Sequence, residues 1–135
     1  MTQFEPDYDP RHNPHKVHRG LKRVIMAACH SMSGFRFAFK EEDAFKQELL
    51  LGLLMAPWAF ILEFDRVERL LLLGSIILVL MMELLNSGIE AAIDRISFEH
   101  HSLSKRAKDY GSAAVLLALI LCGAIWITLL HPHLF

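Results

Sequence analysis

The stretch LLLLGSIILVLMM, residues 70–82, holds no charged side chain and runs directly into ELLNSGIEAAID, residues 83–94. An α-helix rises about 1.5 Å per residue, so about 20 apolar residues are needed to cross the roughly 30 Å hydrocarbon core of a membrane. Together with its flanking residues, the run predicts a transmembrane helix over residues 70–89. Two further apolar runs approach the same length, residues 45–64 and 111–130.

The composition favours a small membrane protein over a soluble one. The chain has 135 residues, of which 53% are hydrophobic, and its mean hydropathy is +0.33. A soluble all-α domain is the alternative, but three such runs in so short a chain leave little polar face for water. A net charge of −1 argues against nucleic-acid binding, which calls for a basic surface. Cys29 and Cys122 are far apart and indicate neither a disulfide framework nor a cysteine-based metal site. We therefore expect an all-α membrane protein.

Lysine and arginine flank the apolar runs unevenly. They are frequent before the first run and between the second and third, whereas the first connector, EFDRVER, has only two and the C-terminal HPHLF has none. Because basic flanks stay on the cytoplasmic side, we expect the N-terminus and the second connector to face the cytoplasm. The residues behind this prediction are Arg19, Lys22, Arg23, Arg36, Lys40 and Lys46, followed by Arg95, Lys105, Arg106 and Lys108.

The segment before the first run, over about residues 20–43, has the periodicity of an amphipathic helix. Its basic side chains lie mostly off the apolar stripe, which is typical of a helix at the membrane interface. Packing against the protein's own spans is the alternative. Residues 1–18 show no periodicity and predict a flexible tail, in which His12, His15 and His18 could bind a metal only on an ordered scaffold. The apolar stripe consists of Leu21, Ile25, Ala28, Met32, Phe35 and Phe39.

Polar residues line one face of the helix that follows the central apolar run. At about 100° per residue, Glu83, Asn86, Ser87, Glu90 and Asp94 all fall within about a third of the circumference. A charge at mid-membrane costs on the order of 2.5–3.5 kcal/mol on insertion scales, and such residues generally face a protein interior or an aqueous cavity. Asp94 is explained equally well as an ordinary helix end in water. Glu83 lies too close to the apolar run for that explanation, so it indicates a functional site.

Carboxylates that extend from inside the membrane edge out to water suit a particular chemistry. Oxygen ligands favour a hard cation such as Mg²⁺, which takes one or two carboxylates and completes its shell with substrate phosphates and waters. Glu90 is a candidate ligand, and the deeper Glu83 could act as a general base toward a hydroxyl presented from the lipid side. The following stretch, FEHHSLSKRAKDYGS, could neutralise a polyphosphate, although a solvated loop is the simpler interpretation of Lys105 and Arg106.

Three stretches resemble the small bacterial integral-membrane diacylglycerol kinases. ELLNSGIEAAID is similar to the signature of that family, and RAKDYGSAAV, residues 106–115, is similar to a second family stretch at the expected distance. KRVIMAAC together with FRFAFKEEDAFKQE resembles its N-terminal surface helix running into the first span. The resemblance implies a homotrimer of three-span subunits in the bacterial inner membrane, with sites shared between adjacent subunits. The implied reaction moves the γ-phosphoryl group of MgATP onto the primary hydroxyl of diacylglycerol and gives phosphatidic acid.

The same resemblance implies a role for individual residues. Glu83 would be the catalytic base, Glu42 and Glu90 would hold Mg²⁺, and Asn86 would support that site. The implied ATP-binding residues are Arg23, His30, Glu42, Asn86, Glu90, Glu99, His100, His101, Lys108 and Asp109. The implied lipid-substrate residues are Arg23, Ala28, Arg36, Ala44, Glu48, Glu83 and Ser112.

Other functions remain open at this point. Some members of the family prefer undecaprenol as the acceptor, and no residue pattern in this chain separates the two lipids. A small oligomeric membrane transporter would also place a lone glutamate in a span, but it gives no reason for Glu42, Glu90 or the KDYGS segment. A structural scaffold would tolerate an apolar replacement of the polar face. Phosphorylation of lipid by ATP distinguishes the kinase from the last two.

Overall fold

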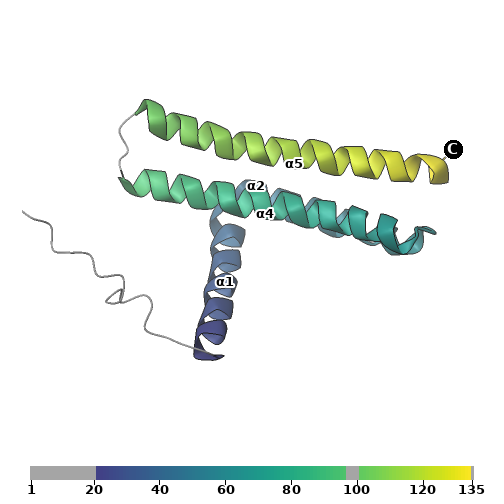
Figure 1. Cartoon of the computed structure of the whole chain (residues 1–135), viewed down its shortest axis with the longest axis horizontal. Coiled ribbons are helices and arrows are strands. Elements are labelled where there is room, and N and C mark those ends of the chain that lie inside the picture. The colour runs from purple at the N-terminus through teal and green to yellow at the C-terminus, as the bar shows by residue number, and fades with distance from the viewer. Residues whose placement is uncertain (1–20, 97–100, 135) are drawn as a thin grey trace, which may run out of the picture. The chain divides into compact units, whose positions relative to one another are not determined.

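The computed structural model describes residues 21–96 and 101–134, and every regular element in these ranges is a helix. The predicted tail, residues 1–18, lies outside the described residues. The chain divides into two compact units, Met1–Arg36 and Phe37–Phe135, with the division inside the first helix. The helices, labelled in Figure 1, are α1 (Leu21–Glu41), α2 (Asp43–Met55), α3 (Trp58–Ile61), α4 (Arg66–Ile96) and α5 (Ser102–Leu134).

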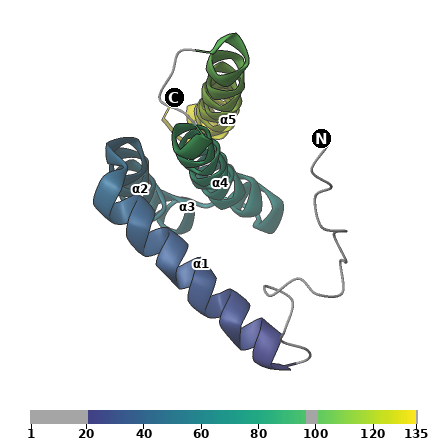
Figure 2. The same ribbon diagram turned by 90° about the vertical axis from the view of Figure 1, so that its left-hand side faces the viewer.

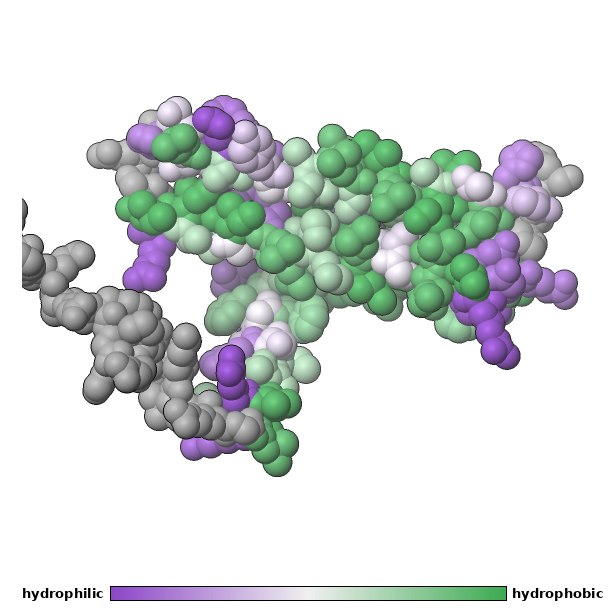
Figure 3. Space-filling model, viewed as in Figure 1, coloured by the Kyte–Doolittle hydropathy of each residue, from purple (hydrophilic) through white to green (hydrophobic). Residues whose placement is uncertain are grey.

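Three helical segments are long and apolar enough to cross a membrane, namely Asp43–Ile61, Arg66–Ile96 and Ser102–Pro132. Large apolar side chains cover their outer surfaces, such as Leu70, which is 71% exposed, and Leu117, which is 68% exposed. Figure 3 shows this hydrophobic surface extending along the helices. A soluble domain would bury such side chains, whereas lipid tails solvate them. The prediction of an all-helical fold is therefore confirmed for the described residues, and three of their helical segments have the length and composition of membrane spans.

The helices extend differently from the apolar runs in the sequence. Helix α4 continues past residue 89 to Ile96, and α5 begins at Ser102, well before residue 111. Both spans therefore carry polar turns beyond the hydrocarbon-length segment, and these turns hold Glu90, Asp94 and Lys108. The first span is interrupted at Pro57, because α2 ends at Met55 and α3 begins at Trp58. Proline lacks the amide hydrogen that would continue the helix.

The first connector is held by side chains of its own. Asp65 Oδ1 accepts hydrogen bonds from the amides of Val67 and Glu68 at 2.7 and 2.8 Å, and Glu68 Oε2 accepts from the Asp65 amide at 2.9 Å. This reciprocal arrangement caps the N-terminus of α4. Arg69 donates from Nε to the carbonyl of Ala59 at 2.8 Å and stacks over the Phe60 ring at 5.4 Å. Arg69 therefore ties α3 to the start of α4.

Helix α4 packs against both α5 and α2, as Figures 1 and 2 show. The core between α4 and α5 contains Leu72, Val79 and Trp126, all buried. Trp126 Nε1 donates to the Leu72 carbonyl at 3.2 Å, so a polar link joins the two helices inside the core. Against α2 the backbones approach closely, because a Cβ on Gly52 would lie 2.6 Å from Ile76 Cγ2.

Candidate functional site

The polar face expected on α4 is present and partly buried. Glu83 retains 5% exposure, although its neighbours along the helix are largely apolar. Asn86 and Glu90 follow at half-buried positions, and Asp94 lies one turn beyond Glu90. The helix therefore presents carboxylates at successive depths from the apolar region outward. A carboxylate at the position of Glu83 is costly to keep unless other polar groups or a ligand accompany it.

Helix α2 and the residue before it bring further carboxylates to Glu83. Glu42 lies between α1 and α2 in an extended conformation, with φ −102° and ψ 107°. The charges of Glu42 and Glu90 act on Glu83, and the charge of Glu83 acts on Glu48, so Glu83 lies within electrostatic reach of each of the other three carboxylates. The packing of α2 on α4 therefore brings Glu42 and Glu48 toward Glu83, which is distant from both in sequence. Together with Glu90 of α4, these carboxylates form one acidic group. This group is the candidate site.

Several polar atoms at this face are buried without a hydrogen-bond partner. They are Glu48 Oε2, Asn86 Oδ1 and Ser87 Oγ. Buried polar atoms in folded proteins are nearly always hydrogen-bonded, so unpartnered atoms that lie together call for a ligand, water or a second chain. Because these atoms lie near Glu83 and Glu90, we interpret this face as a binding site.

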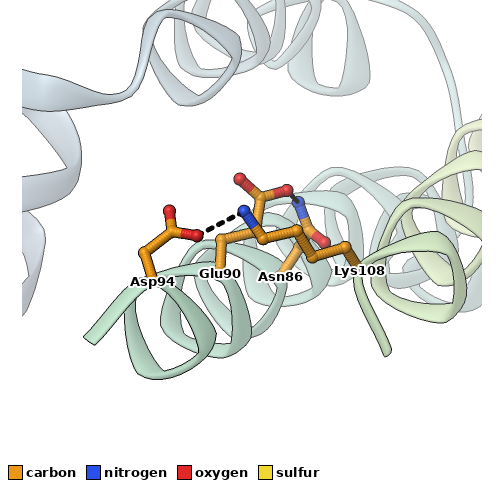
Figure 4. Close-up of polar contacts among 4 residues, drawn as sticks. All are labelled: Asn86, Glu90, Asp94 and Lys108. Atoms are coloured by element: carbon orange, nitrogen blue, oxygen red, sulfur yellow. Dashed lines mark hydrogen bonds and ion pairs between the residues drawn. The ribbon is translucent and has the colours of Figure 1, made fainter. Parts of the chain in front are cut away.

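The outer part of the face is connected by side chains, drawn in Figure 4. Asn86 Nδ2 donates to Glu90 Oε1 at 3.1 Å, and Lys108 Nζ of α5 lies 2.6 Å from Asp94 Oδ1. Helix α5 approaches Asn86 at Gly111, where an added Cβ would overlap Asn86 Oδ1. The absence of a side chain at Gly111 therefore leaves room for Asn86 to face Glu90.

The other described candidate residues of the second connector and α5 form no hydrogen bond or ion pair with the acidic group. Glu99 and His100 lie outside the described residues. His101 caps α5, because its Nδ1 accepts from the Leu103 amide at 3.2 Å. Asp109 pairs with Lys105 at 2.5 Å on the exposed side of α5. Ser112 is exposed, and so is Ala44 in the first turn of α2.

The candidates on α1 belong to the other unit of the chain. Arg23, Ala28, His30 and Arg36 are all exposed along α1. Met1–Arg36 forms a unit by itself, so these four residues are described only as members of that exposed helix. Their binding roles stay predictions.

Whether the acidic group suits a metal ion depends on its donor atoms. In the described ranges, 21–96 and 101–134, no three histidine, cysteine, aspartate or glutamate side chains converge closely enough to hold a metal alone. The donors of Glu42 and Glu90 are hard oxygens, however, and Mg²⁺ commonly takes only one or two carboxylates plus phosphate and water oxygens. The unpartnered Asn86 Oδ1 adds another oxygen acceptor nearby. The residues present therefore fit Mg²⁺ bound together with a phosphate-bearing molecule.

The cross-helix pair of Lys108 and Asp94 was missed when the sequence was considered alone. From the sequence, Asp94 is explained equally well as a helix end, and Lys108 is an ATP contact only by the family resemblance, so neither residue indicates the other as its partner. The register of α4 does place Asp94 on the same face as Glu83, which was the available signal. Only the packing of α5 on α4 shows which basic residue reaches it.

The fold and the site define a three-span helical membrane protein with a buried acidic site at one end of its spans. A family model described as "Prokaryotic diacylglycerol kinase" matches residues 29–130. The diacylglycerol kinase of Pseudomonas aeruginosa is 48% identical over 118 residues, which cover 87% of this chain and 96% of that protein. The diacylglycerol kinase of Escherichia coli K12 is 48% identical over 117 residues, covering 84% of this chain and 93% of that protein.

The diacylglycerol kinase of Haemophilus influenzae is 43% identical over 107 residues, covering 79% of this chain and 91% of that protein. The family-model match, residues 29–130, includes the acidic face of α4, the residues of α2 that approach it and the start of α5. This chain belongs to the prokaryotic diacylglycerol kinase family, and the family resemblance expected from its motifs is confirmed.

Proposed function

We propose that this protein is an ATP-dependent lipid kinase that transfers the γ-phosphoryl group of MgATP to the primary hydroxyl of diacylglycerol, forming phosphatidic acid. The observation that carries the proposal is the buried Glu83 carboxylate beside Glu42 and Glu90 in an otherwise apolar span. Membership in a family whose relatives are named diacylglycerol kinase supports the same activity.

In this proposal the carboxylates have complementary roles. Glu83 accepts the proton of the lipid hydroxyl as a general base while that oxygen attacks the γ-phosphorus. The bond between the γ-phosphorus and the oxygen bridging it to the β-phosphate breaks, and ADP leaves. Glu42 and Glu90 would hold Mg²⁺, which would supply positive charge to the phosphate oxygens. Asn86 orients Glu90 through its hydrogen bond. Phosphoryl transfer demands mainly alignment and charge neutralisation, so a small chain needs few further groups.

Nucleotide and lipid reach this site from different directions in the proposal. ATP comes from the aqueous side, where Lys108 lies at the outer end of the acidic face. Diacylglycerol moves laterally in the membrane toward Glu48 and Glu83, next to a groove lined by Glu48, Gly52 and Val79. The proposed nucleotide contacts are Arg23, His30, Glu42, Asn86, Glu90, Glu99, His100, His101, Lys108 and Asp109. The proposed lipid contacts are Arg23, Ala28, Arg36, Ala44, Glu48, Glu83 and Ser112.

The membrane arrangement is part of the proposal. In the proposed topology the N-terminus and the second connector face the cytoplasm, which the lysines and arginines flanking the apolar runs support, and the protein lies in the bacterial inner membrane. Helix α1 lies at the cytoplasmic interface, which its exposed Phe35, Phe37 and Phe39 support. Subunits assemble as a homotrimer, supported by the unpartnered Asn86 and Ser87 atoms, which an adjacent subunit can satisfy.

Lipid phosphorylation in detergent micelles tests the function. Purified protein is given γ-labelled ATP, Mg²⁺ and either diacylglycerol or undecaprenol, and labelled lipid is quantified. We expect phosphatidic acid, dependent on Mg²⁺. Faster labelling of undecaprenol would reassign the acceptor within the family, and no labelling of either lipid would contradict a kinase activity.

A further inference from the structure

The ion pair between Lys108 and Asp94 joins α5 to α4 at the outer end of the acidic face, as Figure 4 shows. The Lys108 side chain is 35% exposed and the Asp94 side chain is 48% exposed, so both remain accessible to water. Ion pairs this exposed contribute little to stability, typically about 0–1 kcal/mol. The contribution of this ion pair to folding stability therefore does not explain why Lys108 of α5 reaches Asp94 of α4.

Two carboxylates compete for the Lys108 ammonium. Asp94 lies one helical turn after Glu90, and the charges of both act on Lys108. The hydrogen bond goes to Asp94, whereas Glu90 Oε1 accepts from Asn86 Nδ2. If Lys108 moved to Glu90, it would neutralise a carboxylate proposed to bind Mg²⁺. Asp94 therefore keeps the ammonium beside Glu90 without letting it occupy the Glu90 oxygens.

We propose that Asp94 is a positioning residue that holds Lys108 at the outer edge of the acidic site, ready for a nucleotide phosphate. The inference rests on the proposed function, because the nucleotide is the phosphate-bearing substrate in that function. A lysine ammonium has three N–H donors, so it can donate to a phosphate oxygen and keep its bond to Asp94. Holding the long side chain in advance also reduces the entropy lost when the nucleotide binds.

The test compares the wild-type chain with Asp94→Asn, which keeps the shape of the side chain and removes its charge. The measurements are the KM for MgATP, the KM for diacylglycerol, the dissociation constant of a non-hydrolysable ATP analogue with Mg²⁺, and the thermal unfolding temperature in detergent. We expect the KM for MgATP and the analogue dissociation constant to rise about tenfold, which corresponds to about 1.4 kcal/mol. The KM for diacylglycerol and the unfolding temperature stay close to wild type. Asp94→Glu recovers most of the nucleotide affinity.

Two double variants separate positioning from a simple link between helices. In a Lys108→Met background, Asp94→Asn causes no further loss of analogue binding, because Asp94 acts through Lys108. The exchanged pair, Asp94→Lys with Lys108→Asp, restores an ion pair but leaves nucleotide affinity low. Full recovery of nucleotide affinity by the exchanged pair would overturn the inference, as would wild-type affinity in Asp94→Asn.

Failure of the proposed function gives a different result. A wild-type protein that binds the analogue but labels no lipid contradicts the kinase activity, while its comparison with Asp94→Asn still decides the role of Asp94. A wild-type protein that does not bind the analogue overturns both.

Discussion

Glu83 combines a charged side chain with burial in a span, and its proposed chemistry follows from that combination. The carboxylate retains 5% exposure and lies within reach of the charges of Glu42 and Glu90. A structural role does not need a carboxylate there, because an apolar residue would pack at lower cost. A general base that receives a lipid hydroxyl does need one.

The first prediction concerns this carboxylate. Glu83→Gln keeps the volume of the side chain but removes the basic oxygen, so turnover should fall by at least about a hundredfold, the lower range for general-base catalysis. The unfolding temperature should change little. Steady-state lipid phosphorylation measures the effect, with the exposed connector variant Glu63→Gln as the matched control. Turnover near wild type in purified Glu83→Gln would remove Glu83 from this role.

Glu90 carries the second prediction. Glu90→Gln keeps the hydrogen-bonding shape but removes the charge, so the Mg²⁺ concentration for half-maximal activity should rise by about tenfold, because ligand charge sets affinity for hard cations. Binding of paramagnetic Mn²⁺ in the presence of an ATP analogue provides a second measurement that does not depend on turnover. An unchanged metal titration in both assays would count against ligation by Glu90.

The third prediction tests the close approach of α5 to Asn86. Gly111→Ala places a Cβ on Asn86 Oδ1, so either Asn86 moves away from Glu90 or the helices separate. Overpacking of this kind costs about 1–3 kcal/mol, and turnover should fall with it. Gly123→Ala on the same helix is the control, since nothing lies within 4 Å of its added Cβ. Equal behaviour of the two variants in thermal unfolding and in lipid phosphorylation would show that the Gly111 contact is unimportant.

At the scale of the elements, α4 is the centre of the packing. Its core face contacts α5 through Leu72 and Trp126, and its polar face is approached by Glu48 of α2 and by Glu42 just before α2. Ser75 adds to the core link, since its Oγ donates to the Leu72 carbonyl at 2.8 Å and lies 3.4 Å from Cys122 Sγ. Because the core link lies along the same helix as the site, the register between α4 and α5 also decides where Lys108 meets the acidic face.

The fourth prediction follows from the core link. Trp126→Phe retains an aromatic ring but loses the donor to the Leu72 carbonyl, so the free energy of unfolding should fall by about 0.5–1.5 kcal/mol, the usual net value of a hydrogen bond. Thermal unfolding in detergent measures the change. Trp58→Phe is the control, because Trp58 is 52% exposed. An equal or larger loss of unfolding free energy in Trp58→Phe would show that the hydrogen bond from Trp126 to Leu72 does not contribute to stability.

At the scale of the whole molecule, the proposed assembly of subunits accounts for the buried polar atoms that have no partner. Glu48 Oε2, Asn86 Oδ1 and Ser87 Oγ lack partners within the described part of the subunit. Neighbouring subunits of the proposed homotrimer can supply groups that reach them. The fifth prediction is therefore that native mass spectrometry of the full chain, 15.4 kDa by sequence, finds three copies per particle. A monomer that is fully active at the same concentration would contradict shared sites.

Much of the fold could be predicted from local properties of the chain. The span over residues 70–89 is predicted from the apolar run at residues 70–82 and its flanking residues, because their combined length and hydropathy match the membrane. The common face of Glu83, Asn86 and Glu90 follows from helical periodicity. The break of the first span after Met55 was less evident, because lipid-embedded helices can tolerate a proline such as Pro57. The helix through Asp94 was expected from the periodicity of its polar face, whereas the start of α5 at Ser102 was not predicted, since its first polar turns carry no hydropathy signal.

The amino-acid sequence by itself determined that this is a three-span helical membrane protein with an acidic face on its second span, since hydropathy and periodicity act within one helix. Only the tertiary structure decided that Glu42 and Glu48 join Glu83, that Gly111 makes room for Asn86, and that Lys108 rather than another basic residue pairs with Asp94. The physical reason is that these partners lie on different helices, and the register in which α2 and α5 pack on α4 is set by side-chain fit between helices.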